Sequence, residues 1–107
     1  MEVIRTKSIT ARDAFNTTSA LGLKDMKNDS IIVTGVLVKD KTDNEGKVTV
    51  VGYLKAEDGT MYATVSSTVL DQLEALAEIV ETEETCEVTI IPKESKDGNE
   101  YIQLGLV

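Results

Sequence analysis

The chain has 107 residues, one cysteine, no histidine and a net charge of −8. This length allows one domain with a modest core, and the lone Cys86 cannot form an internal disulfide. Without histidine, Ser-His and Cys-His nucleophile pairs and histidine metal sites are excluded, so we expect neither catalysis nor a cofactor.

The start of the chain, MEVIRTKSITARDAF, lacks the apolar core of a signal peptide. No apolar run approaches the roughly 20 residues that span a bilayer. We therefore expect an intracellular protein without membrane contact.

The negative charge is concentrated in one segment. Residues 57–87 contain nine Asp and Glu and no Lys or Arg, so the rest of the chain carries all 11 basic residues. A negative net charge ordinarily disfavours a nucleic-acid partner. Because the acidity is confined to one segment, the remaining surface is still open to an anionic ligand.

In chain order, residues 1–29 are expected to form an irregular segment that packs on or flanks a main domain of residues 30–107. Residues 30–39, SIIVTGVLVK, predict a buried strand. Gly35 in its middle predicts a bulge, and residues 40–46 predict a polar loop.

The next two strands are predicted at residues 47–55 and 60–66, joined by a tight Asp58-Gly59 turn. In the first, alternation places Tyr53 and Lys55 opposite the face of Leu54. In the second, alternation places Tyr62 opposite the face of Met61, Ala63 and Val65.

Residues 66–81 predict an amphipathic helix that Ser66 or Ser67 can cap. Its apolar stripe is Val69, Leu70, Leu73, Leu76, Ala77 and Val80. Glutamates lie on the outer side, which is typical of a solvated face. Residues 87–92 and 101–107 predict a last hairpin, with Ile102, Leu104 and Leu106 inward and Tyr101, Gln103 and Gly105 outward.

Three strands, a helix and a hairpin follow the order of the oligonucleotide-binding (OB) fold. We therefore expect a mostly β protein, a five-stranded OB-fold-like barrel with one amphipathic helix between strands 3 and 4. In that fold, ligands lie across the second and third strands, here flanked by the loops at 40–46 and 93–99.

The expected binding face combines aromatic rings with lysines, as single-stranded nucleic acid requires. Tyr53, Tyr62 and Tyr101 are expected outward to stack on bases. The expected phosphate contacts are Lys39, Lys41, Lys47, Lys55, Lys93 and Lys96. For each tyrosine, the alternative is a structural role at a sheet edge with a hydrated hydroxyl.

Residues 56–69, AEDGTMYATVSSTV, and the downstream KDGNEYIQLGLV resemble the single-stranded-DNA-binding proteins of protein-primed bacteriophages, the phi29 type. The resemblance covers about residues 30–107. It places Tyr62 on the family's tyrosine after the Asp-Gly turn, Tyr101 on an aromatic position and Lys96 on a hairpin lysine. Tyr53 has no firm counterpart, and the strong negative charge departs from the family pattern.

The resemblance implies non-catalytic, sequence-independent coating and protection of displaced strands during phage DNA replication, in the cytoplasm of the infected bacterium. It also implies a monomer or weak homo-oligomer, with phage replication proteins as further candidate partners. The alternative is an acidic protein-interaction module, or a phage inhibitor of a host factor, that uses the glutamates of residues 74–87.

Overall fold

The structure is a computed structural model that describes residues 3–107 and is mostly β. In chain order its elements are β1 (Ile4–Arg5), helix α1 (Ala11–Phe15), the 3-10 helix η1 (Asn16–Ser19), β2 (Leu21–Gly22), the 3-10 helix η2 (Leu23–Met26), β3 (Ser30–Thr42), β4 (Val48–Ala56), β5 (Met61–Thr64), helix α2 (Ser67–Glu83), β6 (Cys86–Glu94) and β7 (Glu100–Leu106). Strands β3 to β7 and helix α2 occupy the segments predicted from the sequence. The expected count of five strands and one helix is too low, because the N-terminal residues add short elements.

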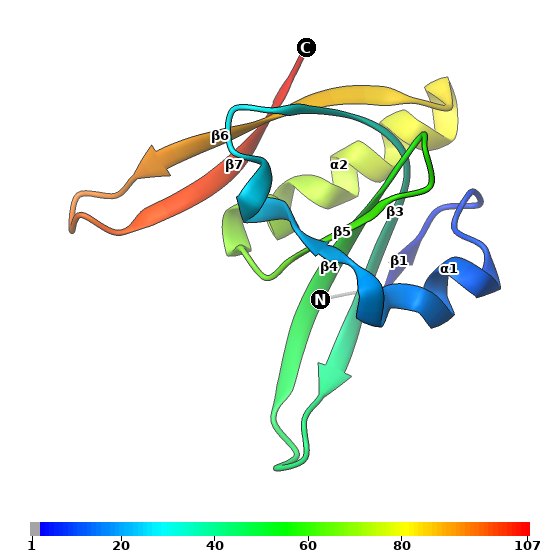
Figure 1. Ribbon diagram of the computed structural model, residues 1–107, viewed down its shortest axis with the longest axis horizontal. Helices are drawn as coiled ribbons and strands as arrows, with labels where there is room; N and C mark the ends of the chain where they lie inside the picture. Colours follow the sequence, from blue (N-terminus) through cyan, green and yellow to red (C-terminus); the bar gives the residue numbers. More distant parts are fainter. Residues whose placement is uncertain (1–2) are drawn as a thin grey trace.

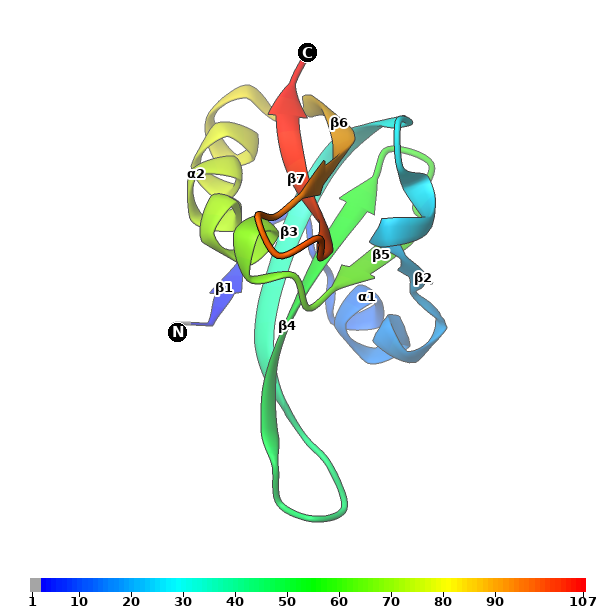
Figure 2. The ribbon, with the colours of Figure 1, turned by 90° about the vertical axis from the view of Figure 1, so that its left-hand side faces the viewer.

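All seven strands belong to one curled sheet. Its order is β2-β5-β4-β3-β6-β7, with β1 paired to β3 beside this path. Every pair is antiparallel except β2 with β5. Within residues 3–107, β5 and β7 are not hydrogen-bonded to each other, so the half-barrel stays open between them (Figures 1 and 2).

Helix α2 fills one face of the curled sheet. Ser66 caps it, since its side chain accepts a hydrogen bond from the Val69 N–H at 3.5 Å. All six apolar positions predicted from the helical spacing are buried. The helix can approach closely because β4 has Gly52 beneath it, where a Cβ would lie 2.5 Å from Leu73 Cδ1.

A second, smaller core lies on the other face of β3, β4 and β5. It contains Ile9, Leu37, Val51, Tyr53 and Met61. Ile9 packs over Gly35, where β3 changes register as the sequence predicted. We refer to residues 3–29 as the N-terminal segment; through Ile9 and its neighbours it covers a sheet face that the sequence analysis expected to be open to solvent.

Two hairpins extend from the body of the molecule. The β3–β4 hairpin is the longer arm, and the β6–β7 hairpin projects in another direction (Figures 1 and 2). β3 continues to Thr42, so part of the expected 40–46 loop is strand. Leu106, expected inward, is 68% exposed near the end of the edge strand β7, although Val88 opposite it on β6 is buried. No helix in residues 3–107 is both long and apolar enough to cross a bilayer.

Candidate functional site

The three tyrosines do not share one open face. In the β4–β5 register Leu54 lies opposite Tyr62, so Tyr62 points into the α2 core and is 9% exposed. Tyr53 points to the opposite face, where the N-terminal segment leaves it 4% exposed. The expectation that both stand outward is wrong, because each face of these strands is covered by its own core. Neither ring can stack on a base in this structure.

Tyr101 is the accessible tyrosine. It lies near the start of β7 with 37% of its surface exposed. The register of β6 and β7 places Lys93 directly opposite it. Since residues opposite each other on antiparallel strands share a face, one expected phosphate contact lies beside the one exposed tyrosine ring.

Two of the expected phosphate-binding lysines hold the N-terminal segment. Lys55 Nζ lies 2.8 Å from Asp13 Oδ2 and donates to the Ser8 carbonyl at 3.3 Å. The hydrogen bond from Lys55 lowers the pKa of the Asp13 carboxyl below its ordinary value. Lys39 Nζ donates to Thr17 Oγ1 at 3.2 Å and sits 5.6 Å from the centroid of the Tyr53 ring. Their ammonium groups are therefore engaged within the protein.

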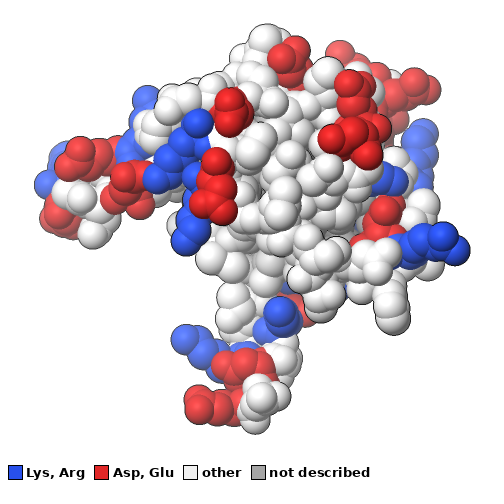
Figure 3. All heavy atoms as spheres, in the orientation of Figure 1, with Lys and Arg blue, Asp and Glu red and all other residues white. Residues whose placement is uncertain are grey.

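The other four expected lysines are exposed on the two hairpins. Lys41 and Lys47 belong to the β3–β4 arm, and Lys93 and Lys96 to the β6–β7 arm. Acidic residues are interspersed with them on both arms (Figure 3). Each arm therefore offers separate cations rather than a continuous basic surface.

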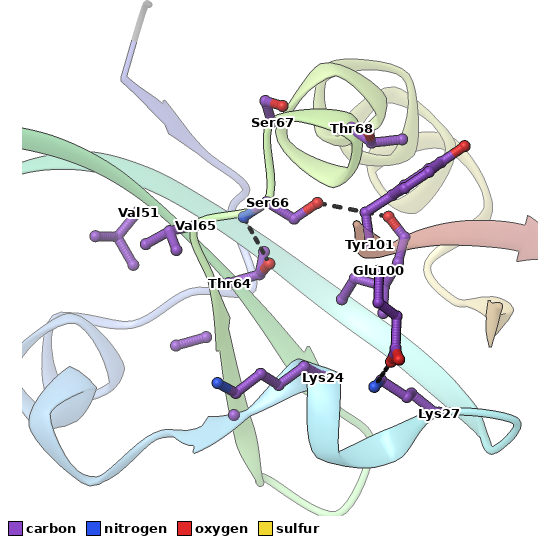
Figure 4. Close-up of a pocket in the computed structure, with 13 residues that line it drawn as sticks. Lys24, Lys27, Val51, Thr64, Val65, Ser66, Ser67, Thr68, Glu100 and Tyr101 are labelled. Atoms are coloured by element: carbon purple, nitrogen blue, oxygen red, sulfur yellow. Dashed lines mark hydrogen bonds and ion pairs between the residues drawn. The ribbon is translucent and has the colours of Figure 1, made fainter. Parts of the chain in front are cut away.

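A groove of about 690 Å³ opens where β5 and β7 fail to pair (Figure 4). Its walls come from η2, the end of β5, the start of α2 and the start of β7. It is lined by Gly22, Lys24, Lys27, Val51, Ala63, Thr64, Val65, Ser66, Ser67, Thr68, Glu100, Tyr101 and Ile102. Val65, 63% exposed, and the Tyr101 ring give it apolar surface that solvent reaches.

Ser66 and Gln72 join α2 to β7 across this opening. Ser66 Oγ donates to the Ile102 carbonyl at 3.5 Å. Further along the helix, the Gln72 side chain forms two hydrogen bonds with the backbone of Leu104. These contacts tie α2 to β7 beside the groove although no strand closes the sheet there.

Two lysines of the groove were missed by the sequence analysis. Lys24 and Lys27 project from η2 and the residue after it. Leu23 is fully buried beside them, and the Asn28 N–H donates to the Ile90 carbonyl at 2.7 Å. Lys27 forms an ion pair with Glu100. In the sequence, this stretch offers only the apolar Leu23 without any periodic pattern. Such a stretch does not indicate where the neighbouring lysines lie.

The chemistry of the groove suits a flat ring that stacks, together with a neighbouring anionic group. Tyr101 and Val65 offer surface for stacking and apolar contact, and Lys24 and Lys27 line the groove, the latter paired with Glu100. Lys93 adds positive charge beside Tyr101 from outside the groove lining. The described residues contain no cluster of three or more His, Cys, Asp or Glu that could hold a metal ion. The glutamates of α2 at positions 74, 78, 81 and 83 are exposed, as expected for a solvated face.

A family model described as phage single-stranded DNA-binding protein, phi29 type, matches residues 7–107. The matched span includes the whole groove and both lysine-bearing hairpins. Comparison with curated proteins finds no match. Comparison with solved structures finds none either.

Proposed function

The chain belongs to the phi29-type family of phage single-stranded DNA-binding proteins, and we propose that it binds a single strand in the groove beside Tyr101. In this proposal binding is independent of base sequence and involves no catalysis. The observation that carries it is the half-exposed Tyr101 ring on the wall of a groove that also holds lysines. Stacking on an aromatic ring contributes about 1–3 kcal/mol per base and accepts every base.

The phosphates of the strand would meet the lysines around this groove. Lys93 lies opposite Tyr101, and Lys96 follows on the same hairpin. Lys24 lies on the groove wall, and Lys41 and Lys47 would offer separate cations on the β3–β4 arm. We do not assign phosphates to Lys39 or Lys55, because the N-terminal segment already engages them.

We further propose that β3 to β7 with α2 form an OB-like barrel. In support, β3 pairs with both β4 and β6, and α2 connects β5 to β6. OB folds bind oligonucleotides over their second and third strands. Here the N-terminal segment covers one face of those strands. The site proposed for the strand therefore lies at the opening between β5 and β7 instead. Residues 30–107 would form the binding domain, and residues 1–29 would complete it with Lys24 and Lys27.

The proposed biological role is to coat and protect displaced strands during phage DNA replication. One stacking ring and dispersed lysines suit this role, because neither selects a base sequence. The site of action would be the cytoplasm of the infected bacterium. Other phage replication proteins would be further partners, and the protein would act as a monomer or weak homo-oligomer.

The test is a titration of the protein with an unstructured, fluorescently labelled oligonucleotide at low salt. Wild-type protein should raise the label's anisotropy, and Tyr101→Ala should weaken binding by about tenfold, the loss of one base stack. Tyr101→Phe should bind nearly as wild type while losing most of the quenching of tyrosine fluorescence, since Tyr53 and Tyr62 are buried.

Two results would contradict the proposal. One is the absence of any anisotropy change at micromolar to sub-millimolar protein. The other is unchanged affinity in Tyr101→Ala, with the fold verified by its thermal unfolding transition. Leu106→Ala, which alters another exposed side chain of the same strand outside the groove, is the matched control.

A further inference from the structure

Lys27 and Glu100 form an ion pair at one end of the groove (Figure 4). We propose that Glu100 is a positioning residue that occupies Lys27 in place of a phosphate and is displaced when a strand binds. Glu100 then limits affinity, because the strand must compete with a carboxylate of the protein itself. The inference rests on the proposed function and adds a residue that opposes binding.

The backbone around Lys27 is held in place. Asn28 adopts a positive φ of 69° and donates its N–H to the Ile90 carbonyl at 2.7 Å. The Ile90 N–H donates to the Asp29 carbonyl at 2.9 Å, which makes a second connection to β6. On the other side, Leu23 is fully buried. The backbone of this segment is therefore fixed beside the groove, and Lys27 lies within reach of it.

Glu100 precedes the proposed stacking ring in β7, and the two side chains leave the strand in different directions (Figure 4). It is the first residue of β7 and immediately precedes Tyr101. Both residues line the groove. A strand that continues along the groove from Tyr101 toward Lys27 would bring a phosphate close to the carboxylate of Glu100, where like charges repel. The carboxylate and the phosphate would compete for the same ammonium group.

The ion pair is weak enough to be replaced. The side chain of Lys27 is 39% exposed and that of Glu100 is 57% exposed. Exposed pairs of this kind contribute little, because water and salt screen them. A phosphate is an equally good acceptor for a lysine ammonium, and its binding also releases counterions from the strand. Exchange of Glu100 for phosphate is therefore accessible at low salt.

The experiment compares the oligonucleotide affinity of wild type, Glu100→Gln, Lys27→Gln and the double variant. Glu94→Gln is the matched control, because Glu94 lies directly opposite Glu100 in the β6–β7 register and its replacement removes the same charge. Glu100→Gln should tighten binding by about two- to fivefold relative to Glu94→Gln. When Lys27 is already replaced by Gln, Glu100→Gln should increase the affinity for the oligonucleotide by no more than Glu94→Gln does.

The possible results distinguish a failure of the proposed role of Glu100 from a failure of the proposed function. A wild-type protein that binds no oligonucleotide at low salt overturns both. A wild type that binds, with equal gains from Glu100→Gln and Glu94→Gln, overturns only the role of Glu100. A gain from Glu100→Gln that persists in full without Lys27 also overturns it, since the effect would then be simple repulsion.

Discussion

The side-chain amide of Gln72 pairs with both backbone groups of Leu104. Gln72 Nε2 donates to the Leu104 carbonyl at 2.9 Å, and Gln72 Oε1 accepts from the Leu104 N–H at 2.8 Å. The amide thus takes the place of a neighbouring strand at the free edge of β7. This is how the sheet stays open at the groove while the backbone of Leu104 keeps its hydrogen bonds.

Replacing Gln72 by Ala should lower the free energy of unfolding by about 1 kcal/mol, because the Leu104 N–H and carbonyl lose their partners in a partly buried site. The measurement is chemical denaturation, together with hydrogen exchange of the Leu104 amide, which should become faster. Glu74→Ala, an exposed change on the same helix, is the control. Equal stability of the two variants would refute this account of the β7 edge.

The contact between Asp13 and Lys55 predicts a dependence of stability on pH. The hydrogen bond from Lys55 lowers the pKa of Asp13 in the folded protein. A carboxyl with a lowered folded-state pKa stabilises the protein above its unfolded-state pKa of about 3.9, and this contribution disappears as the pH falls through the folded-state value.

Asp13→Asn should therefore cost about 1 kcal/mol at pH 7 and progressively less below pH of about 4. Asparagine keeps an oxygen that can accept from the Thr10 N–H, so the change chiefly removes the charge. The check is the free energy of unfolding of both proteins between neutral and acidic pH. A difference that stays constant across this range would show that the ion pair does not hold the N-terminal segment.

Variants of the hairpin lysines should differ from a Lys39 variant in how strongly oligonucleotide binding depends on salt. Replacing Lys41, Lys47, Lys93 or Lys96 by Gln should reduce the slope of log affinity against log salt by about 0.7 for each phosphate that the variant no longer neutralises. Lys39→Gln removes the same charge but should leave the slope unchanged, since Lys39 binds Thr17. Equal slopes in all five variants would count against the assigned phosphate path.

Helix α2 and the turns were predictable because their signals are local. The 3.6-residue spacing identified all six buried positions of α2. The Asp58-Gly59 pair marked a turn in which Gly59 has a φ of +90°. Gly35 likewise marked the bulge in β3. Each of these features depends on residues close together in the chain.

The tyrosines were misplaced because alternation tells which residues share a face of one strand, but not what covers that face. Tyr53 is covered by Ile9, which belongs to a segment without regular periodicity. Lys24 and Lys27 were missed for a related reason. Their positions depend on the backbone hydrogen bond between Asn28 and Ile90, two residues far apart in the sequence.

A map of backbone amide shifts during titration with a short unstructured oligonucleotide at low salt would locate the bound strand on the protein. Binding beside Tyr101 should produce the largest changes at residues 63–68 and 100–102, with smaller ones at Lys24 and Lys27. Residues 74–83, on the acidic part of α2, should stay unchanged. Shifts confined to residues 74–83, without shifts at the groove residues, would contradict the claim that the strand binds beside Tyr101.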